Sequence, residues 1–189
     1  RDRQAYLKLR RFTIDLMVVT TAITALMGWT PLYDGVVRQV MGIPTAIADA
    51  ALPGLRIMLL WSAAIAWRRF RQGVMIRHNA TRLVGYGTIV RLIGSAGTAA
   101  GLAVWGKIPG VWVSAWALMV GVIAEAIFAQ IASGPIVARI ASSPGEPGAS
   151  RPELTYGALV RYHAPLAATT LLLLLGQPIV GAALARTPH

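Results

Sequence analysis

The chain has 189 residues, of which 56% are hydrophobic and 13% charged, with a mean hydropathy of +0.59 and no cysteine. Soluble domains carry about 25% charged residues, so this chain has too few to cover the surface of a soluble globule. The hydrophobicity also excludes a disordered chain, and the absence of cysteine excludes a disulfide scaffold. The composition therefore predicts an all-α integral membrane protein, a polytopic bundle of transmembrane helices.

Five segments are candidates to cross a membrane as helices, because a transmembrane helix needs about 20 mostly apolar residues. In chain order they are residues 12–32, 53–75, 83–105, 111–131 and 156–185. Strands of a membrane barrel would instead alternate in hydrophobicity over about 10 residues. The lengths of the segments therefore predict about five transmembrane helices.

Two connections between these spans have a distinct composition. Residues 35–51 mix apolar and polar side chains and predict a pair of short interfacial helices interrupted at Pro44. Residues 142–152 are rich in Pro, Gly and Ser, which is typical of a linker. This linker separates the first four spans, in residues 1–141, from the fifth span, in residues 153–189.

The Lys and Arg residues behind the formal net charge of +11 are distributed unevenly, so that connections rich and poor in them alternate along the chain. Lys and Arg gather in the amino-terminal arm and in the second and fourth connections, whereas the third connection holds only Lys107. By the positive-inside rule, the amino terminus of the chain is then cytoplasmic. Most of the charge is explained by orientation and by contact with anionic membrane lipids, and no nucleic-acid partner is expected.

No enzyme motif is present in the sequence. The zinc-protease, phosphate-loop and nucleophile-elbow patterns are missing, and the three histidines, His78, His163 and His189, lie far apart. We therefore expect neither an enzyme nor a bound metal or cofactor.

Charged residues within a span are the most informative, because each is costly in lipid and usually faces protein or water. On a helix of 100° per residue, Arg68, Arg71 and Gln72 share one face. Met75 falls on the same face, whereas Arg69 points away from it. The planar fork of arginine suits phosphate and carboxylate, so this stripe predicts a wall for an anionic group. The alternative is a cytoplasmic anchor of a short span.

Arg91 and Glu125 lie inside the third and fourth spans. Their depths from the cytoplasmic end are about 12 Å and 9 Å at 1.5 Å per residue, so two antiparallel helices would bring them together. We expect either a structural Arg–Glu pair or a residue that faces a transport cavity. Gly97 and Gly101 have the spacing that lets two membrane helices approach closely.

Several strings resemble the multidrug/oligosaccharidyl-lipid/polysaccharide exporter superfamily, and most closely its progressive-ankylosis-type and bacterial polysaccharide-exporter-like members. The strings, in chain order, are RDR, LPGLRIMLLWSAAIAWRRFRQGVMIRHNATR, IVRL, IPGVWVSAWALMVGVIAEA and APLAATTLLLLLGQPIVGAALAR. The likeness covers nearly the whole chain, although its motifs are loose patterns. Arg91 and Glu125 stand where progressive-ankylosis-type relatives also have Arg and Glu.

The resemblance implies a segment of a larger transporter that is built from two six-helix lobes. Residues 1–141 would be four helices of the amino-terminal lobe, residues 142–152 the cytoplasmic linker, and residues 153–189 the first helix of the second lobe. The remaining helices of the same polypeptide would then be its partners. A complete short protein of five spans is the alternative to a fragment.

The sequence thus predicts an exporter or flippase of the inner (plasma) membrane that works by alternating access. Its substrate would be anionic, either a lipid-linked sugar or a phosphate compound. The candidate cavity residues are Arg68, Arg71, Gln72, Arg91 and Glu125. A multidrug cation exporter of the same fold and a non-transporting membrane scaffold or assembly subunit are the alternatives.

Overall fold

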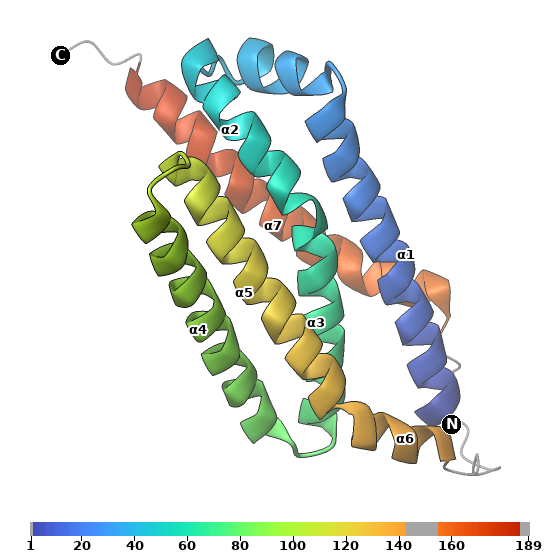
Figure 1. The fold of residues 1–189 in the computed structure, drawn as a ribbon. Helices are drawn as coiled ribbons and strands as arrows, with labels where there is room; N and C mark the ends of the chain where they lie inside the picture. Colours follow the sequence, from blue (N-terminus) through green and yellow to red (C-terminus); the bar gives the residue numbers. More distant parts are fainter. Residues whose placement is uncertain (1, 143–154, 186–189) are drawn as a thin grey trace. The chain divides into compact units, whose positions relative to one another are not determined.

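A computed structural model describes residues 2–142 and 155–185, and every regular element in this part of the chain is helical (Figure 1). The elements are α1 (Asp2–Trp29), the π-helical turn η1 (Asp34–Val40), α2 (Thr45–Ile57), the 3₁₀ turn η2 (Met58–Leu60), α3 (Trp61–Arg77), α4 (Thr81–Trp105), α5 (Gly110–Ala132), α6 (Gly134–Ser142) and α7 (Tyr156–Ala185). The predicted all-α class is therefore confirmed.

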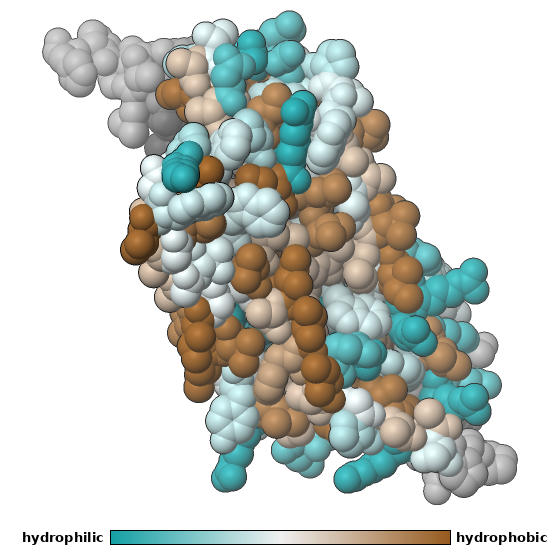
Figure 2. All heavy atoms as spheres, in the orientation of Figure 1, coloured by the Kyte–Doolittle hydropathy of each residue, from teal (hydrophilic) through white to brown (hydrophobic). Residues whose placement is uncertain are grey.

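Four helical stretches are long and apolar enough to cross a membrane. They are Arg3–Trp29, Thr45–Arg77, Thr81–Trp105 and Gly110–Ala132, and they correspond to the first four predicted spans. Figure 2 shows hydrophobic residues over the middle of the visible face and hydrophilic residues toward its two ends. The chain is thus a membrane protein. The fifth predicted span is helical over its whole length as α7, and its crossing of a membrane stays a prediction.

The second span differs from the prediction, because it begins at Thr45 rather than at Pro53. Pro53 lies inside α2, where its ring removes one backbone hydrogen bond. Transmembrane helices tolerate this loss because neighbouring groups and local 3₁₀ winding satisfy the freed carbonyl. The 3₁₀ turn η2 follows α2 and leads directly into α3, so α2, η2 and α3 together form one span of 33 residues.

Of the pair of short helices predicted in residues 35–51, only the first is a short, separate helix. The first helix is the π-helical turn η1, whereas the second is the start of the longer helix α2. The two helices are separated at Gly42–Pro44, where Gly42 has a φ of +66°. The preceding Tyr33 is buried and donates a hydrogen bond of 2.7 Å to the carbonyl oxygen of Ala48. This bond ties the segment to α2.

Helices α4 and α5 form an antiparallel hairpin in which the backbones approach closely (Figure 1). A Cβ atom at Gly121 would lie 2.9 Å from the carbonyl oxygen of Arg91, and one at Gly94 would lie 3.4 Å from the Cα of Gly121. The predicted packing through Gly97 and Gly101 is wrong for the described residues, because a Cβ at either position would meet no atom within 4 Å. The contact face of α4 is instead the one that carries Gly94.

Helix α6 was not expected within residues 1–141, and it contacts α1 and α3. One end of the bundle holds α6, the amino-terminal end of α1 and the turn between α3 and α4 (Figure 1). The other end holds η1 and the turn between α4 and α5. The contacts divide the chain into two compact units, residues 1–145 and 146–189, so α7 is described by itself. The predicted linker, residues 142–152, lies outside the described residues except for Ser142, which ends α6.

Candidate functional site

The polar stripe of the second span lies on one face of α3, as predicted from helical geometry, and the structure turns this face toward the interior of the bundle. Arg68, Arg71 and Met75 are buried, Gln72 is half-buried, and Arg69 is exposed to the outside. The spacing of three, four and seven residues puts these side chains on one side of α3. The alternative of a solvated cytoplasmic anchor is therefore wrong for Arg68 and Arg71, because an anchor would expose them.

Glu125 of α5 is the centre of a polar cluster with α3. Its side chain is fully buried, and its two carboxylate oxygens have different partners. Arg68 donates from Nη1 to Oε2 at 2.5 Å, and Gln72 donates from Nε2 to Oε1 at 3.1 Å. Arg68 and Gln72 are one helical turn apart, so α3 holds the carboxylate from two successive turns. The ion pair leaves neither charge uncompensated in the low-dielectric interior.

Helix α4 closes over this carboxylate at Gly87. A Cβ atom at Gly87 would lie 3.5 Å from Cγ of Glu125 and 3.4 Å from the ring of Phe128. A methyl group at this position would thus make ordinary contacts with both side chains. The glycine allows α4 to cover Glu125 with backbone, which keeps the ion pair away from the lipid.

Arg71 lies one turn from Arg68 and has a different environment. Its guanidinium stacks on two aromatic rings, with Cζ 4.7 Å from the ring centroid of Trp67 and 5.9 Å from that of Phe70. Its Nη1 donates to Oγ of Ser133 at 3.5 Å, and Ser133 is fully buried. Arg71 forms no ion pair with a carboxylate in the described part of the chain. Its charge is held by the aromatic faces, by the hydroxyl group of Ser133 and by the side chain of Tyr6, which also interacts with the guanidinium.

Both buried arginines keep unused hydrogen-bonding capacity. The Nε atoms of Arg68 and Arg71 are buried and have no hydrogen-bond partner within the described residues. Buried polar atoms are nearly always paired in folded proteins. The described residues thus leave two donors on one face of α3 without an acceptor.

Arg91 is not part of this cluster, in contrast to the predicted Arg91–Glu125 pair. The antiparallel register sets Gly87 against Glu125 and Arg91 against Gly121, so Arg91 lies about one turn, or 5.4 Å, farther along α4. The carboxylate of Glu125 is occupied by Arg68 and Gln72. Arg91 is half-buried on α4 and forms no ion pair within residues 2–142.

The sequence reading missed three contributors to this site. Ser133 binds Arg71, and Trp67 both stacks on Arg71 and donates a hydrogen bond of 3.1 Å from Nε1 to Oε1 of Gln130. A signal for Ser133 was present, because it follows Glu125 by eight residues, a spacing that returns to the same side of a helix. Ser133 caps the carboxyl end of α5. Nothing in the sequence pattern marks Trp67 or Gln130.

Comparison with known proteins adds no relative: no family model, curated protein or solved structure matches this chain. Among the described residues, no group of three His, Cys, Asp or Glu side chains could hold a metal ion. The polar groups of the cluster are the guanidinium of Arg68, the carboxylate of Glu125 and the amide of Gln72.

Proposed function

We propose that this chain is part of a membrane transporter that moves an anionic substrate by alternating access. The observation that carries the proposal is an imbalance of buried charge. Two guanidinium groups, Arg68 and Arg71, lie on one interior face of α3, and the carboxylate of Glu125 compensates only the first. An anion that enters beside α3 would pair with Arg71 and satisfy the free Nε donors.

The substrate class follows from this chemistry. A phosphate or pyrophosphate group offers several acceptor oxygens, which match the planar fork of arginine in two-point contacts. A lipid-linked pyrophosphate sugar and a small phosphate compound share this group. The aromatic faces of Trp67 and Phe70 hold the guanidinium of Arg71 without neutralising it, so the charge stays available for a ligand.

The sequence resemblance supports the same proposal. In an exporter of the multidrug/oligosaccharidyl-lipid/polysaccharide type, two lobes rock about a central site, and the described bundle would supply four helices of one lobe. The proposed location is the inner (plasma) membrane, with a cytoplasmic amino terminus. The Lys and Arg residues near the amino terminus support this orientation by the positive-inside rule. A cation exporter is less well supported, because the one carboxylate of the cluster is already paired with Arg68.

The test uses the full-length protein in proteoliposomes with two probes, radiolabelled inorganic pyrophosphate and a fluorescent short-chain polyprenyl pyrophosphate. Arg71→Gln should lower transport of the accepted probe tenfold or more, because it removes the uncompensated charge but leaves the Arg68–Glu125 pair intact. Arg69→Gln is the matched control, since Arg69 is exposed on the opposite face of α3, and it should stay within twofold of the wild type.

Uptake of pyrophosphate would identify a small phosphate compound as substrate, and translocation of the prenyl probe alone would identify a lipid-linked one. Transport of neither probe, or wild-type transport by Arg71→Gln, would overturn the proposal. The double variant Arg68→Gln with Glu125→Gln removes both charges of the pair together. It therefore tests the cluster without leaving a buried charge unpaired.

One observation favours a second candidate, a membrane scaffold that does not transport. Gly97 and Gly101 leave an open small-residue face on α4 within the described bundle, and such a face is where another membrane helix packs. Solvent access separates the two candidates. Single cysteines at positions 71 and 91 should react with a charged aqueous thiol reagent if a wet cavity exists, and a scaffold would leave both positions unlabelled.

A further inference from the structure

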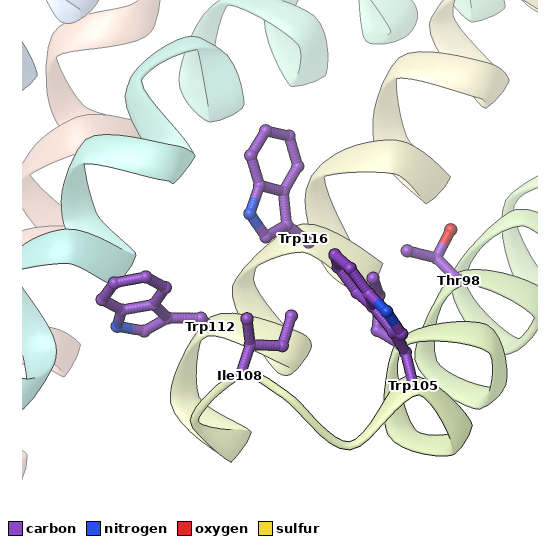
Figure 3. Close-up of a pocket in the computed structure, with 6 residues that line it drawn as sticks. Thr98, Trp105, Ile108, Trp112 and Trp116 are labelled. Carbon is purple, nitrogen blue, oxygen red and sulfur yellow. The ribbon is translucent and has the colours of Figure 1, made fainter.

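A hollow lies far along the α4–α5 hairpin from Glu125, where the two helices meet at their connecting turn. It has a volume of about 430 Å³. The residues that line it are Thr98, Leu102, Trp105, Ile108, Trp112 and Trp116. Figure 3 shows Thr98 and Trp105 on α4, Trp112 and Trp116 on α5, and Ile108 on the segment between the helices. Five of the six side chains are hydrophobic or aromatic, so the cleft is suited to an apolar group.

The ends of two candidate membrane-spanning helices form this cleft, so we expect it at the depth of the membrane–water interface. Helices α4 and α5 are both long enough to span, and the turn of residues 106–109 joins them at one end. Tryptophan is enriched at this depth, because its ring is apolar and its N–H is polar. Trp105 is 59% exposed and Trp116 is 45% exposed, so both rings are open to whatever surrounds the bundle.

A single cation stands beside this apolar cleft. Lys107 is the only charged residue of the connecting turn, and its Nζ lies 6.0 Å from the ring centroid of Trp105. Its ammonium group is exposed, and a compact ammonium binds phosphate as a point charge. An apolar slot next to an exposed cation complements a molecule that carries an acyl chain beside a negative phosphodiester.

We propose that this cleft binds an anionic phospholipid, with one acyl chain between the tryptophans and the phosphodiester paired with Lys107. The proposal rests on the α4–α5 turn alone and does not depend on the transport function proposed above. A zwitterionic lipid fits the apolar part but lacks the net charge. One Lys near an anionic membrane surface contributes about 1 kcal/mol, so the expected preference for the anionic lipid is about fivefold.

The experiment measures tryptophan fluorescence of the full-length protein in bilayers that contain acyl-brominated lipid. Brominated phosphatidylglycerol should reach half of its quenching at about a fivefold lower mole fraction than brominated phosphatidylcholine. Lys107→Gln should abolish this preference, and Lys107→Arg should keep it. Arg82→Gln is the matched control, since it removes an exposed cation at the opposite end of α4, and it should leave the preference unchanged.

A further variant locates the lipid. Trp116→Phe should lower the quenchable part of the emission, because Trp116 lines the cleft, whereas Trp61→Phe, outside the cleft, should leave the emission of the cleft tryptophans intact. Equal quenching by the two lipids, or a preference that survives Lys107→Gln, would overturn the proposal. Quenchable emission that does not change in Trp116→Phe would also overturn it, because the cleft would then be filled by protein.

Discussion

Helix α5 packs against two of its neighbours, α3 and α4, by opposite means. Toward α3 it presents buried polar groups, and the contact is an ion pair and hydrogen bonds centred on Glu125. Toward α4 it presents Gly121, and the contact is a close approach of two backbones. Hydrophobic burial does not drive association between helices in lipid, so packing and polar contacts must do so. One helix therefore uses both of the means that are available in a membrane.

The comparison predicts that the polar interface is the more sensitive to loss of a single group. Glu125→Ala should lower the free energy of unfolding by about 3–5 kcal/mol, because Arg68 is left buried without its partner. Unfolding in mixed micelles, followed by circular dichroism, measures this change. The double variant Arg68→Met with Glu125→Met should cost less than about 1.5 kcal/mol, because it removes both charges together. A double variant as unstable as Glu125→Ala would contradict this account.

The α4–α5 interface should be destabilised when a side chain is added to it, rather than when one is removed. Gly121→Val should destabilise the protein by about 1–3 kcal/mol, because its Cβ would overlap Oγ of Ser95 and would also meet the carbonyl oxygen of Arg91, which cannot rotate away. The matched control is Gly97→Val on α4, which meets no atom within 4 Å in the described bundle. The same unfolding measurement should place this control within about 0.5 kcal/mol of the wild type. Equal losses in the two variants would show that the α4–α5 contact is not specific.

The smallest effect is expected for the hydrogen bond between Gln72 and Glu125. Gln72→Met should cost about 0.6 kcal/mol, the average for a side-chain hydrogen bond between membrane helices. The ion pair still satisfies the other carboxylate oxygen of Glu125. A double-mutant cycle that combines Gln72→Met with Glu125→Gln isolates the coupling, and a coupling energy of zero would remove Gln72 from the cluster.

The sequence predicted those features that depend on one helix at a time. The stripe of Arg68, Arg71 and Gln72 follows from the 100° rotation per residue, and the four spans follow from length and hydrophobicity. Helix α6 was missed because its nine residues are too short for a span, although Pro135, at its second position, is a typical residue of a first helical turn.

Features that depend on the relative position of two helices were not predicted. The similar distances of Arg91 and Glu125 from the cytoplasmic ends of their spans predicted that the two residues pair. These distances do not fix the register of α4 against α5, and they do not account for Arg68 of α3, which pairs with Glu125 instead. In the same way, Gly97 and Gly101 have the spacing of a packing motif, and the register selects Gly94 instead. The spacing of residues shows which of them share a face of a helix, whereas the packing of the neighbouring helix determines which face forms the contact.

The ion pair between α3 and α5 also has a consequence for how the protein is made. Arg68 and Glu125 are 57 residues apart in the chain, and a ribosome adds roughly 5–20 residues per second. Arg68 is thus added to the chain about 3–11 s before Glu125. During that interval α3 carries a charge that is costly at the centre of a bilayer. We therefore expect the second span to stay at the insertion machinery, or at the membrane surface, until α5 has been synthesised and can accompany it into the lipid.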